Sequence, residues 1–183
     1  MPKINRNGVN IFYETYGEGP VVLLTHGFSA TSKMWHDQID SLSSDYCLVF
    51  WDMRGHGSSD YPEDINLYNE KETIEDILSI LDKLNVKKAN IGGMSLGGYM
   101  SLAFYNQFPE RVDSLIIIDT GPGFKNEDAR NNWNNYAIST AEKFELSGLD
   151  SLTGRSKEMD PKNHLNAKGL SKSARGMLTQ HDD

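Results

Sequence analysis

The sequence has 183 residues, with 18 basic and 26 acidic side chains and a formal net charge of −8. This acidic balance argues against a nucleic-acid partner, because neutralising phosphates requires clustered lysine and arginine. The single cysteine, Cys47, excludes a disulfide within the chain and favours a reducing compartment. The polar first residues and the lack of an apolar stretch of ~20 residues predict a cytoplasmic protein with no membrane partner.

Residues 1–123 contain repeated runs of β-branched and apolar residues, which favour strands. An early antiparallel pair is expected from residues 3–5 and 9–13. Further strands are predicted at four apolar runs, namely residues 21–24, 47–51, 88–91 and 115–118. Such runs, without polar alternation, are typical of strands that are covered on both faces in a parallel sheet.

Helical periodicity separates these runs. The spacing of Ile74, Ile77 and Leu81 predicts one amphipathic helix, and residues 96–104 predict a second. A short helix is expected at residues 34–42. Strands that alternate with helices imply right-handed crossovers and a three-layer α/β fold.

The rest of the chain has a different composition. After Phe124 there is no valine and a single isoleucine, Ile138, so helices and loops are expected there. Apolar spacing predicts helices near residues 133–144 and 170–178, with a polar, loop-like segment at 148–161. We therefore divide the chain into a core, residues 1–123, and a helical lid or cap, residues 124–183.

The strongest chemical signal is Gly93-Met94-Ser95-Leu96-Gly97, between a predicted strand and a predicted helix. A Gly-x-Ser-x-Gly motif in this position is typical of a nucleophile elbow, which holds a serine hydroxyl on a tight strand-to-helix turn. Glycine lacks a Cβ, so the strand and the helix can approach each other closely. A glycine-rich turn without catalytic chemistry is the alternative explanation.

Several motifs accompany this one in a fixed order. They are His26-Gly27-Phe28, Trp35, residues 52–59 (DMRGHGSS), the Gly93–Gly97 motif and residues 108–112 (FPERV). With these motifs, the chain from about residue 10 to residue 123 resembles the α/β-hydrolase superfamily, and its esterases and enol-lactonases in particular. The resemblance implies a three-layer, mostly parallel sheet of the α/β-hydrolase type with part of a helical lid.

The resemblance also implies a function and a set of site residues. Ser95 would attack the carbonyl of an ester, a lactone or a similar small acyl substrate. The backbone N–H groups of Phe28 and Leu96 would bind the oxyanion that forms. No metal and no cofactor is implied.

The base and the acid of a catalytic triad are harder to place. In this family an acid and then a histidine follow the nucleophile in chain order, but no strand-like run follows residue 118. The resemblance therefore implies that the carboxyl-terminal strands are missing from this sequence. His164 lies in a polar stretch and His181 is near the last residue, so we expect neither to be the base. Asp119 stays open as the acid, since some members place it after that strand.

The remaining histidines have simpler explanations. In this family the residue at His26 usually orders the loop that carries the first oxyanion N–H, and His56 is expected to fix its own glycine-rich turn. Two alternatives to an active hydrolase stay open. The chain could be an inactive fragment of a longer hydrolase, or a non-catalytic ligand-binding protein with the same fold.

Overall fold

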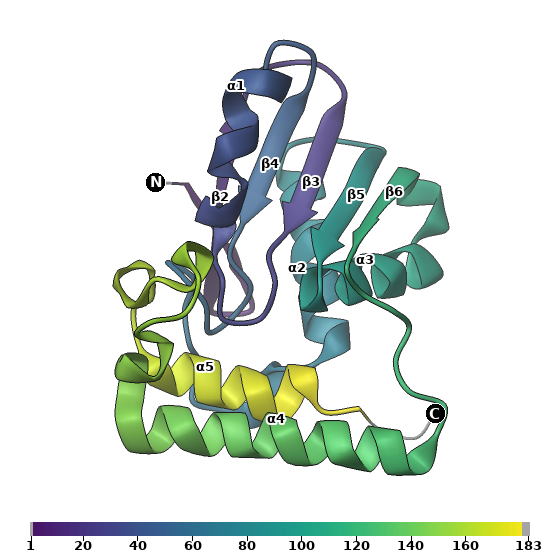
Figure 1. Ribbon diagram of the computed structural model, residues 1–183. Helices are drawn as coiled ribbons and strands as arrows, with labels where there is room; N and C mark the ends of the chain where they lie inside the picture. Colours follow the sequence, from purple (N-terminus) through teal and green to yellow (C-terminus); the bar gives the residue numbers. More distant parts are fainter. Residues whose placement is uncertain (1, 181–183) are drawn as a thin grey trace.

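Six strands form one mixed sheet in the computed structural model, which describes residues 2–180 (Figure 1). The strands are β1 (Lys3–Arg6), β2 (Val9–Tyr16), β3 (Val21–Thr25), β4 (Cys47–Trp51), β5 (Ala89–Met94) and β6 (Val112–Ile118). Their order is β1-β2-β4-β3-β5-β6. The β1–β2 and β2–β4 pairs are antiparallel and the other three pairs are parallel. The predicted strands and the early antiparallel pair are confirmed.

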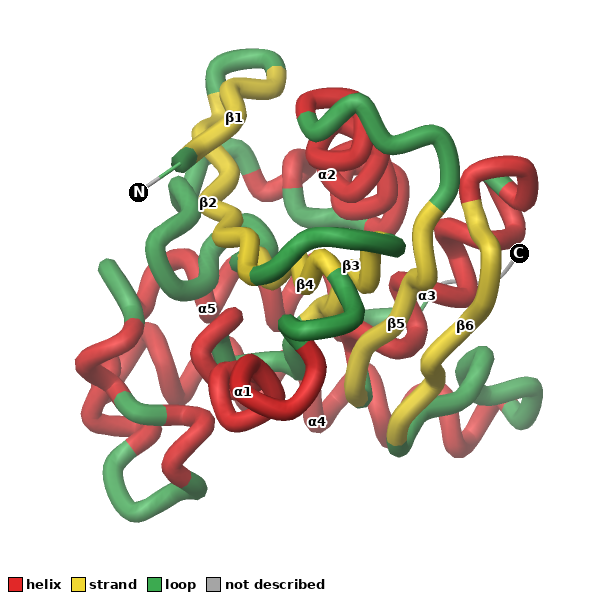
Figure 2. The backbone as a smooth tube through the Cα atoms, turned by 90° about the horizontal axis from the view of Figure 1, so that it is seen from above, coloured by secondary structure: helices red, strands yellow, loops and turns green. Residues whose placement is uncertain are grey.

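Helices cover both faces of this sheet (Figure 2). Helices α2 (Glu70–Lys83) and α3 (Leu96–Gln107) lie on one face, and η1 (Ser32–Gln38) with α1 (Ile39–Leu42) lies on the other. The three-layer α/β prediction is therefore confirmed. The short helix predicted at residues 34–42 is mostly 3₁₀, because only its last turn is α-helical.

The central strands bury both of their faces. Leu23, Val49 and Ile91 belong to the apolar cluster that includes α2 and α3. Their neighbours Val22 and Leu48 belong to the second cluster, which packs around Trp35 of η1. Successive strand side chains point to opposite faces, and here each face meets an apolar layer. This explains why the sequences of these strands are continuous apolar runs.

The run in β6 differs from this expectation. Ile117 is 38% exposed and Ile118 is 39% exposed, so these side chains are not covered. β6 is the edge strand of the sheet and, among the described residues, pairs with β5 alone. The prediction of a strand is correct here, but the prediction of full cover is wrong, because α3 covers only part of β6 and, among the described residues, no strand pairs with its outer edge.

The described residues after β6 contain no strand, as predicted. The cap consists of helices α4 (Glu127–Ser147) and α5 (Ala167–Ser173) and the π-helical turn η7 (Ala174–Leu178). The segment predicted to be loop-like contains the short 3₁₀ turns η4 (Gly148–Leu152) and η5 (Lys157–Met159), and η6 (Pro161–Asn163) follows. Two further 3₁₀ turns, η2 (Ile65–Leu67) and η3 (Pro109–Arg111), lie in the core. Figure 1 shows α4 and α5 side by side across the carboxyl ends of the parallel strands.

Within residues 2–180, no helix combines the length and the apolar character needed to cross a membrane.

Candidate active site

Ser95 lies on the turn between β5 and α3, in a backbone conformation that is rare for a residue with a side chain. Its φ is 52° and its ψ is −119°. A non-glycine residue with positive φ is strained, and such strain persists only where the surroundings enforce it. The Ser95 N–H donates to the carbonyl of Ile118 at 2.9 Å, which ties the turn to the end of β6. The half-buried side chain is therefore held at the carboxyl end of the sheet.

The two motif glycines permit this turn. A Cβ on Gly93 would lie 2.5 Å from the backbone of Gly97, and a Cβ on Gly97 would lie 2.2 Å from the carbonyl oxygen of Thr25. Both separations are far shorter than van der Waals contact, so a larger residue at either position would push α3 away from β5 and β3. The motif has the strand–turn–helix context of a nucleophile elbow.

A second loop lies directly beside this turn. The oxyanion loop, as we call residues 27–29, follows β3, and a Cβ on Gly27 would lie 3.7 Å from the Cβ of Ser95. Among the turn, loop and cap hydrogen bonds of the described residues, none uses the N–H of Phe28 or Leu96. Leu96 is the first residue of α3, where the helix dipole adds partial positive charge. Among the described residues both predicted oxyanion donors therefore have a free N–H. Leu96 directly follows Ser95, and Phe28 follows Gly27, which lies beside Ser95.

A pocket of about 320 Å³ opens at Ser95, between the core and the cap. The core contributes Tyr99 and Asp119, and the cap contributes Trp133, Met177 and other apolar side chains. Among the described residues, no lysine, arginine or histidine lines it. These cap residues were expected only as helix faces, since periodicity shows which residues share a face but not what that face meets.

The two carboxylates that follow β4 and β6 have different environments. Asp119 lines the pocket with Ser95, is exposed, and has a φ of 47°. Asp52 is buried and accepts the backbone N–H groups of Ser32 at 2.7 Å and Ser58 at 2.8 Å. Burial raises the pKa of Asp52, and these hydrogen bonds oppose the shift. Asp52 therefore orders the loops, while Asp119 faces the candidate site.

Three buried histidines hold backbone groups rather than Ser95. His26 donates from Nδ1 to the Gly27 carbonyl (2.7 Å) and accepts the Met53 N–H at Nε2 (3.0 Å). His56 donates from Nδ1 to the Arg54 carbonyl (3.1 Å) and accepts the Ser29 N–H at Nε2 (3.2 Å). These contacts give both rings the structural roles that the sequence predicted.

His164 has the same type of environment, although it comes from the cap. Both of its ring nitrogens bind backbone groups of the core. Burial lowers the pKa of His164 and the pKa of His26 to about 4 each, so both rings are neutral at pH 7. Neither nitrogen of His164 is free to accept a proton from Ser95. The other histidine considered as a base, His181, lies outside the described residues.

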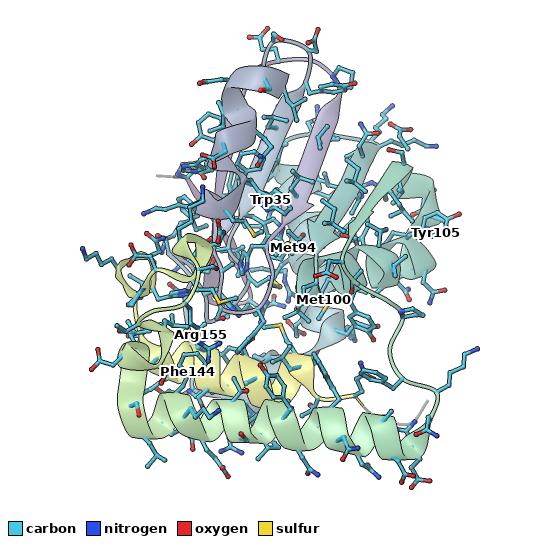
Figure 3. The ribbon with its side chains drawn as sticks, in the orientation of Figure 1. Trp35, Met94, Met100, Tyr105, Phe144 and Arg155 are labelled. Atoms are coloured by element: carbon cyan, nitrogen blue, oxygen red, sulfur yellow. The ribbon has the colours of Figure 1, made fainter. Side chains whose placement is uncertain are left out.

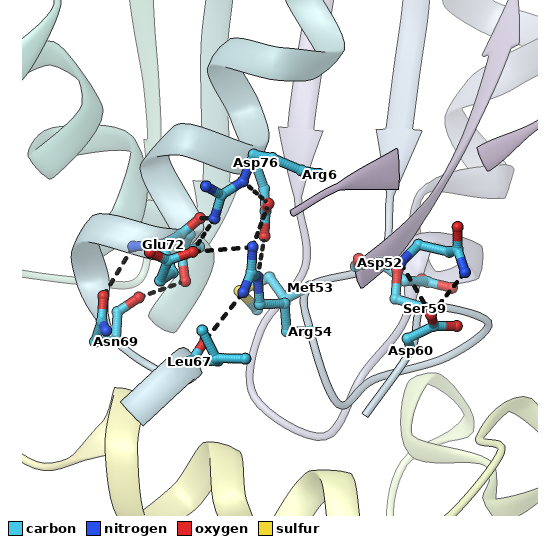
Figure 4. Close-up of polar contacts among 12 residues, drawn as sticks. Arg6, Asp52, Met53, Arg54, Ser59, Asp60, Leu67, Asn69, Glu72 and Asp76 are labelled. Atoms are coloured by element: carbon cyan, nitrogen blue, oxygen red, sulfur yellow. Dashed lines mark hydrogen bonds and ion pairs between the residues drawn. The ribbon is translucent and has the colours of Figure 1, made fainter. Parts of the chain in front are cut away.

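A buried ion-pair cluster fixes the loop that carries His56 (Figure 4). Arg54 is 1% exposed, and its Nε lies 2.6 Å from Oδ2 of Asp76 on α2. Arg6 of β1 and Glu72 of α2 complete the cluster. The pairing was not predicted, because Arg54 and Asp76 are 22 residues apart and no periodic pattern connects them.

The sequence signature of the alpha/beta hydrolase fold matches residues 20–176. The chain belongs to the α/β-hydrolase family. This confirms the predicted family and fold class.

Three similar proteins illustrate this family. The chain is 33% identical to 3-oxoadipate enol-lactonase 1 of Acinetobacter baylyi over 150 residues, which are 81% of this chain and 53% of the lactonase. It is 33% identical to epoxide hydrolase 3 of Siraitia grosvenorii over 114 residues, 62% of this chain and 36% of that protein. The chain therefore spans about half the length, or less, of these curated relatives.

The third is a solved structure, a thermophilic esterase from Thermogutta terrifontis. It superposes with a TM-score of 0.79 at 24% identity, over 97% of this chain and 72% of the esterase. This likeness concerns the fold. All three proteins are hydrolases by name, which agrees with the predicted type of protein family.

Proposed function

We propose that this protein is a serine hydrolase that cleaves an ester, a lactone or a similar acyl compound through an acyl-enzyme intermediate. The observation that carries the proposal is the strained turn at Ser95, which opens onto a pocket that Leu96 also lines. Phe28 does not line this pocket, but it follows Gly27, which lies beside Ser95, and the N–H groups of Phe28 and Leu96 have no partner among the described residues. A left-handed serine is costly to maintain, and strain of this kind gathers at functional sites. The similarity to an enol-lactonase and an esterase gives independent support.

The reaction starts when Oγ of Ser95 loses its proton to a base and bonds to the substrate carbonyl carbon. The carbonyl electrons move onto oxygen, and the N–H groups of Phe28 and Leu96 stabilise that oxyanion. Each such donor is worth roughly 3 kcal/mol of barrier in comparable sites. The intermediate collapses, the leaving oxygen takes the proton, and water then cleaves the Ser95 ester to release the acid.

We place the general base outside residues 2–180. The ring nitrogens of His26, His56 and His164 are already engaged with the backbone. His36 lies on the far side of β4, with its Nε2 2.5 Å from Oε1 of Glu14. Asp119 lines the pocket and is the candidate that would orient an incoming histidine.

The lining of the pocket favours an uncharged, partly aromatic acyl group. Trp133, Phe124 and Met177 supply apolar surface, and the only ionisable carboxylate among the described lining residues is that of Asp119. A substrate carboxylate would meet no cation among the described lining residues and would be repelled by Asp119. Neutral aryl esters should therefore bind at least ~10-fold more tightly than their carboxylate-bearing counterparts. Asp119→Asn should reduce this ratio of affinities, because it removes the charge that repels the substrate carboxylate.

A serine-directed fluorophosphonate probe tests the proposal. Labelling of the wild-type chain that is lost in Ser95→Ala, and kept in the control Ser114→Ala on exposed β6, would support it. Ser114 is a suitable control because its Oγ donates to Asn90 on the outer part of the sheet. Labelling that survives in Ser95→Ala would refute the role of Ser95.

The second candidate function is ligand binding without catalysis. It is favoured by the engagement of all three buried histidines with the backbone, which leaves Ser95 without a base among the described residues. A folded chain that binds neutral aryl esters, as read by Trp133 fluorescence, yet neither hydrolyses them nor reacts with the probe, would establish it.

A further inference from the structure

His164 joins the cap to two loops of the core. Its Nε2 lies 3.0 Å from the carbonyl oxygen of Ser29, and its Nδ1 accepts the N–H of Gly57 at 3.2 Å. A carbonyl can only accept, so the proton of the neutral ring is on Nε2. The next residue strengthens the link, because the Leu165 N–H donates to the Gly57 carbonyl at 3.2 Å. The side chain of His164 is 8% exposed, so these bonds are shielded from water.

Ser29 is the residue that follows Phe28, and histidines hold it on both sides. His56 accepts its N–H at 3.2 Å, and His164 donates to its carbonyl. Ser29 has a φ of 59°, which is unfavourable for a residue with a side chain. The two ring contacts therefore maintain a strained backbone next to a candidate oxyanion donor.

The cap also touches this loop through aromatic side chains. The ring of Phe28 packs edge-on against His56, with centroids 5.5 Å apart, and against Phe144 of α4, with centroids 6.1 Å apart. Figure 3 shows Phe144 on the cap side of the molecule. These contacts are non-directional, so they cover the Phe28 side chain without fixing the direction of its N–H. Fixing that direction requires hydrogen bonds to the backbone.

We propose that His164 is a positioning residue, which holds the oxyanion loop from the cap and aims the Phe28 N–H at the substrate carbonyl. This inference rests on the proposed function, since it assigns a role in oxyanion stabilisation. Without the ring, the Ser29 carbonyl and the Gly57 N–H lose their partners in a buried place, and Ser29 is freed to leave its strained conformation. The Phe28 N–H then points away for part of the time. The cap thus has a role beyond forming the pocket wall.

Two substitutions and a matched control test this role. His164→Phe keeps a ring and removes both hydrogen bonds. His164→Gln returns a donor at the position of Nε2, toward the Ser29 carbonyl. His36→Phe is the control, because His36 is a half-buried core histidine that contacts Glu14 and Tyr16, away from the oxyanion loop.

The first readout is amide hydrogen exchange, which requires no catalysis. In His164→Phe we expect exchange at Ser29, Ala30 and Gly57 to be at least ~10-fold faster, with β4 unchanged. His164→Gln should restore part of the protection at Ser29 and Ala30, and His36→Phe should leave all of it. Equal acceleration across the whole core, or no change in the oxyanion loop, would overturn the inference.

The second readout is the rate at which the probe labels Ser95. His164→Phe should lower the maximal labelling rate ~10- to 100-fold while the half-saturating probe concentration stays within about 2-fold, and Gln should recover part of the rate. An unchanged rate with a loosened loop would also overturn the inference. Wild-type protein that does not label at all would show that Ser95 is not activated in this chain, whereas the exchange data would still decide whether His164 holds the loop.

Discussion

The elbow at Ser95 and the oxyanion loop at residues 27–29 are adjacent but are held in different ways. Both contain a serine with positive φ, 52° at Ser95 and 59° at Ser29. The elbow is fixed by close packing of backbone around Gly93 and Gly97, against each other and against Thr25 of β3. Ser29 is fixed by His56 and by His164, the latter 135 residues away.

This difference has an energetic consequence. Packing of backbone against backbone fails only when atoms are added or a whole element moves. A pair of hydrogen bonds from one histidine ring is lost through a single substitution or a single protonation. The elbow should therefore be insensitive to pH but sensitive to substitution of its glycines. The oxyanion loop should be sensitive to pH, because protonation of a histidine ring breaks its hydrogen bonds.

The largest expected effect on stability concerns the buried ion pair that anchors the loop carrying His56. Asp76→Asn removes the more deeply buried of the two carboxylates that pair with Arg54, and should cost about 3–5 kcal/mol of unfolding free energy. The control is Asp82→Asn on the same helix, whose carboxylate is 61% exposed and pairs with Arg111. That change should cost under ~1 kcal/mol. Urea unfolding measures both, and equal costs would contradict the assignment.

Gly97→Ala tests the packing of the elbow. The added Cβ would lie 2.2 Å from the Thr25 carbonyl oxygen, so α3 must shift, at a cost of about 2–3 kcal/mol. Gly121→Ala is the control, because a Cβ there meets no atom within 4 Å. The same unfolding measurement should give a change near zero for the control. A tolerated alanine at Gly97 would show that the elbow is looser than its geometry indicates.

Acid should weaken the loop rather than the elbow. The pKa of His26 and that of His164 are about 4 when folded, below the ordinary 6.5, so the unfolded chain binds protons first as the pH falls. Stability that is complete above pH 6.5 is thus lost progressively down to pH 4. For each ring the loss should reach roughly 1–2 kcal/mol by pH 5.

His164→Gln isolates one ring in this experiment. The titratable groups that face His164 are His26, His56, Asp52 and Asp160, and the variant leaves all of them in place. Its unfolding free energy should therefore fall less steeply than that of the wild-type chain between pH 6.5 and 5. Parallel curves for the two proteins would show that His164 does not titrate in this range.

The smallest expected effect is an increase in stability. Ser95→Gly removes the side chain that makes a φ of 52° unfavourable and should raise stability by about 1 kcal/mol, while abolishing probe labelling. Ser114→Gly, in strand β6, should instead lower stability by about 1 kcal/mol. A loss of stability in both variants would contradict the claim that Ser95 is strained.

Local patterns predicted much of this fold. The apolar runs located the strands, periodicity located α2, α3 and the cap helices, and composition separated a strand-rich core from a helical cap. One prediction failed for a non-local reason. The run in β6 indicates a covered strand, but cover depends on neighbours, and Ile117 and Ile118 at the end of this edge strand stay exposed. The helix predicted at residues 34–42 is confirmed, although all but its last turn is 3₁₀.

What the sequence by itself determined is the location of the elbow, because its glycines, its serine and the flanking strand and helix are consecutive; its strained conformation is enforced by contacts with Thr25 and Ile118. Only the tertiary structure decided what surrounds it. It placed Asp119 and Trp133 in one pocket with Ser95. It also showed that both ring nitrogens of His164 form hydrogen bonds with backbone groups of two core loops and that neither is free to act as a base. Hydrogen-bond partners that are more than a hundred residues apart leave no periodic trace in a sequence, so such roles become visible only once the chain is folded.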